Sequence, residues 1–203
     1  MTAELRGGRR PAVSRRLIAA GAVVLILLGG AAAWLGRELI SPAAPDPPAR
    51  AAEEFVAVED PAAGISISHP PGWQRVASSD PAVVLLAESG GASMVVRTFD
   101  LGVEIGPANL DAGKKISDDL VRSGKNDLQR PPKQVTLGGL PGWLYLYTFS
   151  DAASGQQGAH AHYFLFRGQT LITIVFQTVP AERFAENAQL FDRIGETLQA
   201  TPR

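Results

Sequence analysis

The chain contains no cysteine among its 203 residues, and this absence excludes several kinds of chemistry. Without thiols it can form neither disulfides nor thiolate metal sites. A cysteine nucleophile is excluded as well, and so is a lipid attached through an N-terminal cysteine. If the chain works in an oxidising compartment, its folded state is therefore held together by burial of apolar surface and not by disulfides.

Motifs of the common enzyme classes are also missing. The sequence has no G-x-S-x-G turn of a serine hydrolase and no H-E-x-x-H helix of a zinc protease. Its most glycine-rich segment, 138–142, leads into a strand pattern, and Pro141 removes a backbone donor that a phosphate site would need. We therefore expect a chain that is not an enzyme and that binds no cofactor.

Positive charge is scarce beyond the N-terminal region. Residues 1–50 carry a net charge of +4, whereas residues 51–203 carry −5. Nucleic-acid binding needs clustered Lys and Arg side chains to meet the phosphates. The acidic balance of the longer part therefore predicts that nucleic acid is not a partner.

The most informative segment that is present is an uncharged apolar run, residues 17–36, preceded by arginines that include Arg15 and Arg16. Twenty residues of helix span about 30 Å, the thickness of the bilayer hydrocarbon core. Arginines on a short N-terminal tail keep that tail in the cytoplasm. The pattern predicts a basic cytoplasmic tail over 1–16, a single-pass transmembrane signal-anchor helix over 17–36, and an extracytoplasmic remainder attached to the cell membrane.

A cleaved secretory signal is the alternative interpretation of the same run. Cleaved signals have an apolar core of about 7–15 residues and a small-residue cleavage site. Ala31 and Ala33 could provide such a site, and the segment 41–43 is a second candidate. The length of the apolar core favours an anchor that is retained.

The rest of the chain is expected to be a linker and one domain. Residues 37–52 are rich in proline and alanine and predict a semi-rigid spacer. Residues 53–200 have the size of one ordinary domain. Strand patterns recur in this part, separated by turns that include the Gly90-Gly91 hairpin and the segment 138–142. The expected strands are 55–58, 64–68, 83–86, 93–99, 135–137, 143–149, 160–166 and 171–179.

Two helices interrupt the strands. Asn109 is expected to cap the first helix and Gly124 to end it. Lys114 and Asp118 are four residues apart on that helix, which predicts a solvent-exposed face. Pro180 opens the second helix. Strands that do not alternate with helices indicate an α+β fold with a mainly antiparallel sheet, and helices on both of its faces would give an αβα sandwich.

Four segments together resemble a known family. They are 64–73, with the sequence GISISHPPGW, then 137–142, 163–168 and 191–194. The pattern resembles the PsbP-like superfamily, including the actinobacterial LpqN/LpqT-type exported proteins. This resemblance implies an αβα sandwich that binds partners and has no shared catalytic apparatus. The chain departs from the LpqN/LpqT type because it lacks a cysteine that could carry a lipid.

His160 and His162 are the clearest candidates for metal ligands. Alternation along a strand places both imidazoles on one face, about 7 Å apart. Such a pair could share a metal ion if a further ligand converged, and His69 or Asp151 could supply one. The alternative is that both histidines lie on a solvent-facing part of the strand near the loop 155–158.

The aromatic residues at 143, 145, 147 and 149 are expected to form a row on one strand face. The row could be a wall of a ligand site, since aromatic side chains dominate contact energies. The alternative is a core face covered by the C-terminal helix, which the apolar neighbouring strands favour.

Three functions follow from these features. The first is a membrane-anchored extracytoplasmic domain that is not an enzyme and that binds another cell-envelope protein. The second is a carrier of a small apolar ligand, held between sheet and helix by Trp143, Tyr145 and Phe176. The third is a metal-dependent enzyme that uses His160 and His162.

Overall fold

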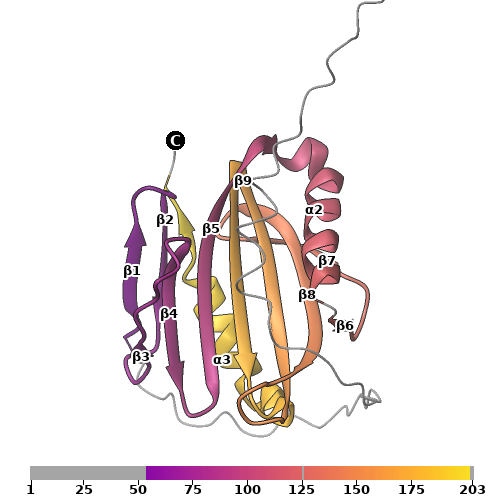
Figure 1. Cartoon of the computed structure of the whole chain (residues 1–203). Coiled ribbons are helices and arrows are strands. Elements are labelled where there is room, and N and C mark those ends of the chain that lie inside the picture. The colour runs from indigo at the N-terminus through magenta and orange to yellow at the C-terminus, as the bar shows by residue number, and fades with distance from the viewer. Residues whose placement is uncertain (1–53, 125, 202–203) are drawn as a thin grey trace, which may run out of the picture.

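Alternation of apolar and polar residues produces two antiparallel sheets in the computed structural model of the chain, which describes residues 54–124 and 126–201 (Figure 1). The expected tail 1–16, anchor 17–36 and linker 37–52 lie outside these residues. Within the described part, neither helix has the length and apolar character that a membrane crossing requires.

The larger sheet has the strand order β3-β4-β5-β9-β8-β6, with β7 paired to β8. All of its pairings are antiparallel, as the sequence predicts. Its strands are β3 (Gln74–Arg75), β4 (Val83–Ser89), β5 (Ala92–Ile105), β6 (Asp127–Leu128), β7 (Lys133–Leu137), β8 (Leu140–Ser150) and β9 (Gln157–Thr178).

Strand β9 turns back on itself at Gly168, which has a positive φ of 60°. Its first arm, 157–165, pairs with β8, and its second arm, 170–178, pairs with β5. The two arms are the strands expected at 160–166 and 171–179. They lie at the centre of the sheet (Figure 1), so β9 places side chains on both buried faces.

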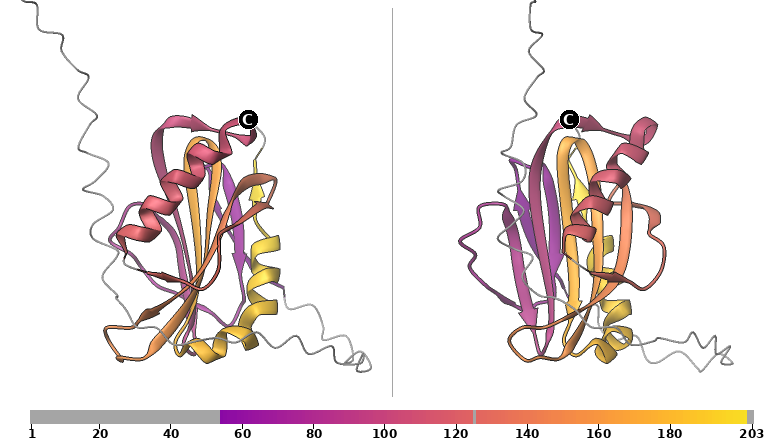
Figure 2. Two further views of the ribbon diagram at one scale, coloured as in Figure 1. Left: turned by 90° about the vertical axis from the view of Figure 1, so that its right-hand side faces the viewer. Right: turned by 45° about the vertical axis from the view of Figure 1, so that its right-hand side comes forward.

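One face of the larger sheet is covered by a small sheet and by the second helix (Figure 2). The small sheet has the order β1-β2-β10, from β1 (Val56–Asp60), β2 (Ile65–His69) and β10 (Gln199–Ala200). The helix α3 (Phe184–Glu196) follows the 3-10 turn Ala181–Arg183. Phe176 of β9 stacks on Phe191 of α3, with ring centroids 4.9 Å apart. This layer contains the larger apolar core.

The opposite face carries the first helix, α2 (Leu110–Ser123), which follows the 3-10 turn Pro107–Asn109. Asn109 is the N-cap residue and Gly124 is the C-cap residue, as predicted. The Asn109 side chain does not cap the helix, because its Oδ1 accepts the Gly106 N–H at 2.8 Å. A second apolar core lies under α2.

Gly113 allows α2 to approach the sheet closely. A Cβ at this position would lie 2.8 Å from the Phe166 ring and 3.0 Å from Ile105. No real Cβ tolerates the first distance without movement of the helix or the ring. The architecture is therefore α2, the larger sheet, and then α3 with the small sheet, a mixed α+β arrangement.

The turn expected over 138–142 is shorter in the structure. Gly138 and Gly139 have positive φ and form the turn, and β8 already begins at Leu140. Gly142 is a strand residue because the two backbones approach closely there: a Cβ would lie 2.1 Å from the Phe164 carbonyl oxygen. A glycine needed for close approach resembles a turn glycine in sequence, which explains the error.

Candidate functional site

The aromatic row of β8 lies on the face that carries α2. The register pairs Trp143 with Phe164 and Tyr145 with His162, so these side chains share that face. Tyr145 and Phe149 are almost fully buried. The prediction of a buried row is therefore correct, but a helix covers only Trp143 and Tyr145, and that helix is α2. The C-terminal helix packs on the other face.

Helix α2 covers the half of this face that contains Trp143 and Tyr145, which we call the covered half-face. The Trp143 indole N–H donates to the Leu110 carbonyl oxygen at 3.3 Å. The Tyr145 hydroxyl donates to Asp118 Oδ1 at 2.6 Å. Asp118 Oδ2 in turn accepts from Lys114 Nζ at 2.7 Å. Each of these polar side chains has a partner.

The sequence predicts that Asp118 and Lys114 lie on a solvent-exposed face. In the structure both side chains are partly buried, because Asp118 accepts the hydrogen bond from Tyr145. Burial acts to raise the pKa of Asp118, but the hydrogen bonds from Lys114 and Tyr145 outweigh it and lower that pKa. Burial, together with the hydrogen bond to Asp118, raises the pKa of Tyr145. Asp118 is therefore an ionised acceptor at neutral pH, and it fastens α2 to β8.

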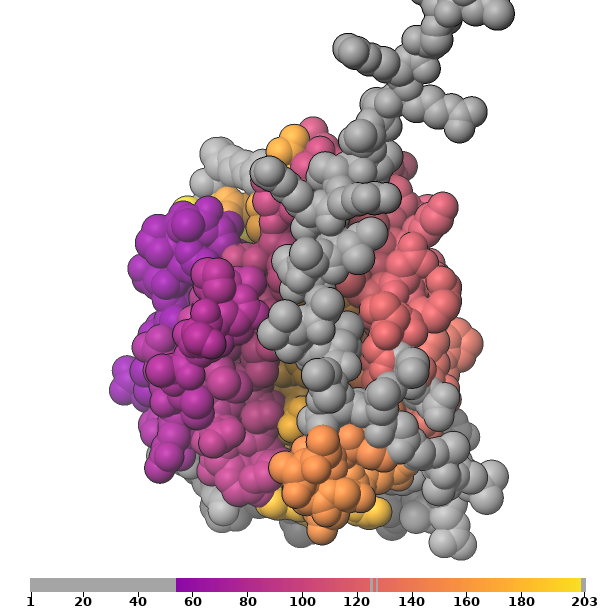
Figure 3. Space-filling model, viewed as in Figure 1, coloured from indigo at the N-terminus to yellow at the C-terminus, as the bar shows by residue number. Residues whose placement is uncertain are grey.

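The second half of the same face contains the predicted histidines and is called the polar half-face. It comprises Arg97, Tyr147, His160, His162 and Gln177. Strand registers place these residues on adjacent strands. In Figure 1, α2 lies over β8, and no other helix or strand of the described residues crosses this face in front of β5 and β9. Figure 3 presents the same side in space-filling form, with β4 and β5 on one flank and α2 on the other.

The two imidazoles are held in place by neighbouring side chains. The His160 Nε2 lies 2.7 Å from Gln177 Oε1, so Nε2 donates to this oxygen. The His162 Nδ1 lies 2.9 Å from the Tyr147 hydroxyl. His162 also stacks on Phe164, with ring centroids 3.9 Å apart. Each imidazole thus makes a hydrogen bond with one of its ring nitrogens, and this bond fixes the orientation of the ring.

The remaining nitrogen of each imidazole has no partner. His160 Nδ1, His162 Nε2 and Arg97 Nε are inaccessible to solvent and make no hydrogen bond to another atom of residues 54–124 and 126–201. Buried polar atoms are nearly always hydrogen-bonded, because an unpaired one costs about 1–3 kcal/mol. Two further unpaired atoms, His69 Nε2 and Thr178 Oγ1, belong to other parts of the described domain. Three such atoms on one half-face identify it as the candidate site.

Electrostatics keep the two histidines neutral. Burial lowers the pKa of His160 to about 4, against a smaller opposing effect of Gln177. Burial lowers the pKa of His162 as well, and the charges of His160 and Arg97 lower it further. Arg97 is thus the single positive charge within the polar half-face at neutral pH, and it acts electrostatically on both His162 and Tyr147.

Metal binding by His160 and His162 requires a further ligand. In metal sites, the ring nitrogen of each imidazole that does not bind the metal typically makes a hydrogen bond to a neighbouring group. The residues 54–124 and 126–201, however, bring no group of three His, Asp or Glu side chains together. Asp151 Oδ2 accepts from Ser154, and His69 Nδ1 lies 2.9 Å from the Pro70 carbonyl oxygen. Two imidazoles alone do not complete a zinc site, so this site stays a prediction.

The proposed ligand residues Trp143, Tyr145 and Phe176 do not come together. Trp143 and Tyr145 belong to the core under α2, whereas Phe176 belongs to the core on the α3 side of the sheet. The sheet lies between them, so they cannot line one cavity. Strand β9 is buried on both faces, and its sequence gave no polar alternation from which the side of Phe176 could be assigned.

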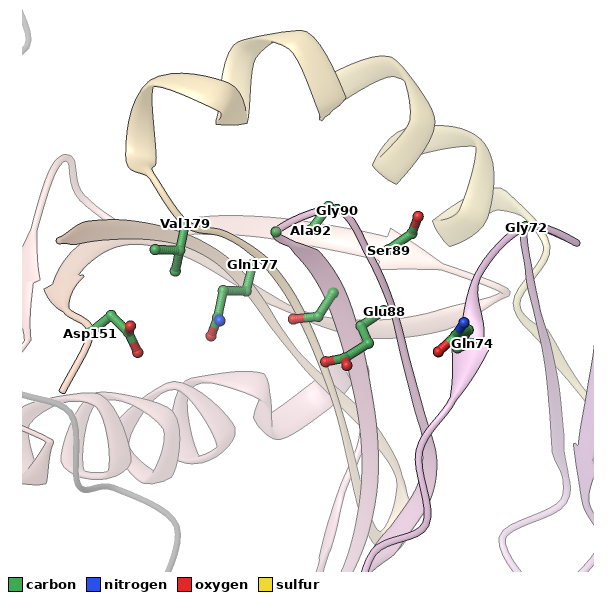
Figure 4. Close-up of a pocket in the computed structure, with 11 residues that line it drawn as sticks. Gly72, Gln74, Glu88, Ser89, Gly90, Ala92, Asp151, Gln177 and Val179 are labelled. Carbon is green, nitrogen blue, oxygen red and sulfur yellow. The ribbon is translucent and has the colours of Figure 1, made fainter. Parts of the chain in front are cut away.

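A hollow of about 440 Å³ adjoins the polar half-face at one end of the sheet (Figure 4). Gln177 lines it and also accepts from His160. Glu88 and Asp151 give it an acidic character. A second hollow, of about 740 Å³, lies beside Arg167 at the other end of the domain. Arg167 there donates to the carbonyl oxygens of Ala63 and Gly64.

Sequence reasoning missed Arg97, Tyr147 and Gln177 as members of the site. Arg97 and Gln177 each occur within apolar strands, at positions that alternation assigns to a buried face. A charged or amide side chain at a buried strand position is unusual, and this pattern could have indicated a functional site. Neither residue belongs to a recognised motif.

Comparison with known proteins agrees on the fold. The chain matches no family model, and no curated protein matches it in sequence. Among solved structures, cyanobacterial PsbP (CyanoP) from Synechocystis sp. PCC 6803 is similar, with 14% identity and a TM-score of 0.51, over 76% of this chain and 97% of that one. The described residues therefore have a PsbP-like fold, and the predicted resemblance is confirmed.

Two further structures are similar. A Bacteroides thetaiotaomicron protein has 14% identity and a TM-score of 0.50; the match covers 73% of this chain and 49% of that one, about half its length. LpqN of Mycobacterium tuberculosis, described as involved in cell envelope biogenesis, has 14% identity and a TM-score of 0.46, over 68% of this chain and 83% of that one. At these identities the likeness extends to the fold and to nothing beyond it.

Proposed function

We propose that the chain is a membrane-anchored extracytoplasmic domain that catalyses no reaction and binds another protein of the cell envelope. The anchor is the apolar run 17–36, and the binding surface is the polar half-face. The observation that carries this proposal is the group of three buried polar atoms without partners, on Arg97, His160 and His162. Such atoms are stabilised when a bound partner supplies hydrogen bonds.

The covered half-face supports this interpretation by contrast. On the same strands, Trp143, Tyr145 and Asp118 find every partner within the domain. Under α2, the domain therefore satisfies these polar groups by itself. The polar half-face lacks such a helix among the described residues, and a protein segment docked there would complete the layer.

Chemical cross-linking in intact cells tests the proposal. The full chain would be cross-linked with formaldehyde, purified under denaturing conditions, and analysed for a discrete adduct by mass spectrometry. Val95 lies on β5 between Ser93 and Arg97 and is half-buried on this face. We expect Val95→Gln to reduce the adduct at least about fivefold, because a polar side chain would disturb the docked segment.

Val103 on the same strand provides the matched control. It is 48% exposed and lies beyond the last residue of β5 that pairs regularly with β9. Val103→Gln should leave the adduct unchanged. An adduct that forms equally with both variants would place the partner elsewhere, and the absence of any adduct from cells that express the chain would contradict the proposal.

A further inference from the structure

Arg97 is the residue of the polar half-face whose charge is least compensated. Its side chain is 18% exposed, and its ion-pair partner Asp80 has Oδ2 3.6 Å from Arg97 Nε. This distance is too long for a hydrogen bond. The Asp80 carboxylate also makes a hydrogen bond within its own loop, where its Oδ1 accepts the Ala82 N–H at 2.9 Å. Desolvation of the guanidinium outweighs the attraction of Asp80, and the pKa of Arg97 is lowered in consequence.

Among the described residues, Asp80 is the one acidic side chain that pairs with Arg97. Tyr147 and His162 are the neighbours on which its charge acts, and both are neutral at neutral pH. Val175 and its register partner Val95 lie on the same face, two residues along their strands from the pair formed by Thr173 and Arg97, and Val175 is 8% exposed. The half-face therefore combines one undercompensated positive charge with apolar surface.

We infer that the partner presents one carboxylate side chain, from an Asp or Glu within an otherwise apolar segment, to Arg97 and His162. The inference rests on the proposed function and names the chemistry of its partner. The two oxygens of a carboxylate match the paired donors of a guanidinium edge, and Asp80 Oδ2, at 3.6 Å from Nε, makes no hydrogen bond to that edge. A longer acidic run is unsuitable, because residues 51–203 already carry a net charge of −5.

Nuclear magnetic resonance of the full chain in detergent micelles tests this recognition with defined probes. The first probe is the capped tripeptide acetyl-Val-Glu-Val-amide, and the second is its neutral counterpart acetyl-Val-Gln-Val-amide. We expect the Glu peptide to shift the Arg97 Nε–H and His162 ring signals, and to bind at least about tenfold more tightly than the Gln peptide. Equal binding of the two peptides, or no binding of either, would overturn the inference.

Octanoate serves as a third probe, because a small organic acid could supply the same group. If octanoate shifted the Arg97 signal and the Glu peptide did not, the ligand would be a small acid and the inference would be wrong. Arg97→Gln should abolish the preference for the Glu peptide over the Gln peptide. The comparison of peptides on the unaltered chain stands even if that variant does not fold.

The peptide-binding experiment and the cross-linking experiment test different claims, so one can fail while the other succeeds. If Val95→Gln removes the cellular adduct but the Glu and Gln peptides bind equally, the docking surface is correct and carboxylate recognition is not. If no adduct forms in cells and the Glu peptide still binds selectively, the half-face recognises a carboxylate, but the proposed protein partner is wrong.

Discussion

The two halves of one sheet face differ in whether their polar groups are satisfied. In the covered half-face, the Tyr145 hydroxyl, the Asp118 carboxylate and the Lys114 ammonium form a continuous chain of hydrogen bonds to α2. In the polar half-face, which lies on the same strands, His160 and His162 each keep a nitrogen without a partner. On this face, the polar side chains under α2 find their partners on α2, whereas His160 and His162 each find one partner within the sheet.

The largest expected effect comes from breaking the covered half-face at Gly113. Gly113→Val would place a branched side chain against the Phe166 ring, which a Cβ alone would approach to 2.8 Å. We expect the free energy of unfolding to fall by about 3 kcal/mol, because α2 must move away from the sheet. Denaturation by urea measures it. Gly106→Ala, which meets no atom within 4 Å, is the control and should change stability little.

The next effect is a pH dependence that belongs to the polar half-face. The pKa of His160 is about 4 in the folded state and 6.5 when the chain is unfolded, so the unfolded state takes up the proton first. Stability is therefore full above pH 6.5 and is lost as the pH falls toward 4. The loss from His160 is about 2 kcal/mol between pH 7 and 5.

Urea titrations of the unaltered chain and of His160→Gln at pH 7, 6 and 5 measure this slope. Between pH 7 and 5, the free energy of unfolding of the variant should fall by about 2 kcal/mol less than that of the unaltered chain. Arg97, Tyr147, His162 and Gln177 surround His160 and remain in both proteins. Identical slopes would show that His160 is solvated and titrates normally.

A smaller loss is expected from cutting the link between α2 and β8. Asp118→Ala leaves the Tyr145 hydroxyl and the Lys114 ammonium without their acceptor, which should cost about 1–2 kcal/mol. Asp119→Ala is the matched control on the next position. Asp119 forms an ion pair with Arg122, and the two side chains are 60% and 72% exposed. This pair should contribute less than about 0.5 kcal/mol to the free energy of unfolding. Thermal unfolding of both variants would compare them.

The smallest effect is expected at His162. His162→Leu relieves the cost of the unpaired buried Nε2 and removes the hydrogen bond to Tyr147, so a gain and a loss in stability nearly cancel. We expect a change within about 0.5 kcal/mol at pH 7 by urea denaturation, in either direction. A loss of 2 kcal/mol or more would place His162 among the satisfied groups and would remove the contrast between the two halves.

Much of the fold follows from local patterns in the sequence. The antiparallel strands, the α2 boundaries at Asn109 and Gly124, and the common face of His160 and His162 were predicted from alternation and capping. These features depend on neighbouring residues in the sequence. The fold class follows from the same information, whereas the resemblance to the PsbP-like superfamily rests on the four segments named above.

The rest depends on contacts between distant segments. The short strands β3, β6 and β10 have two residues each and exist because a neighbour pairs with them. Tyr145 and Asp118 are 27 residues apart, so their hydrogen bond could not be read from helical spacing. The site itself required β5 to pair with the second arm of β9, whose first arm carries His162, and this brings Arg97 toward His162.

Position-specific photo-cross-linking tests the central claim most directly, namely that the polar half-face binds a partner protein. p-Benzoylphenylalanine would replace Val95 in one chain and the exposed Val103 in another, and both would be irradiated in intact cells. We predict one discrete protein adduct from position 95 and none from position 103. Equal adducts from both positions, or an adduct from position 103 alone, would contradict the account.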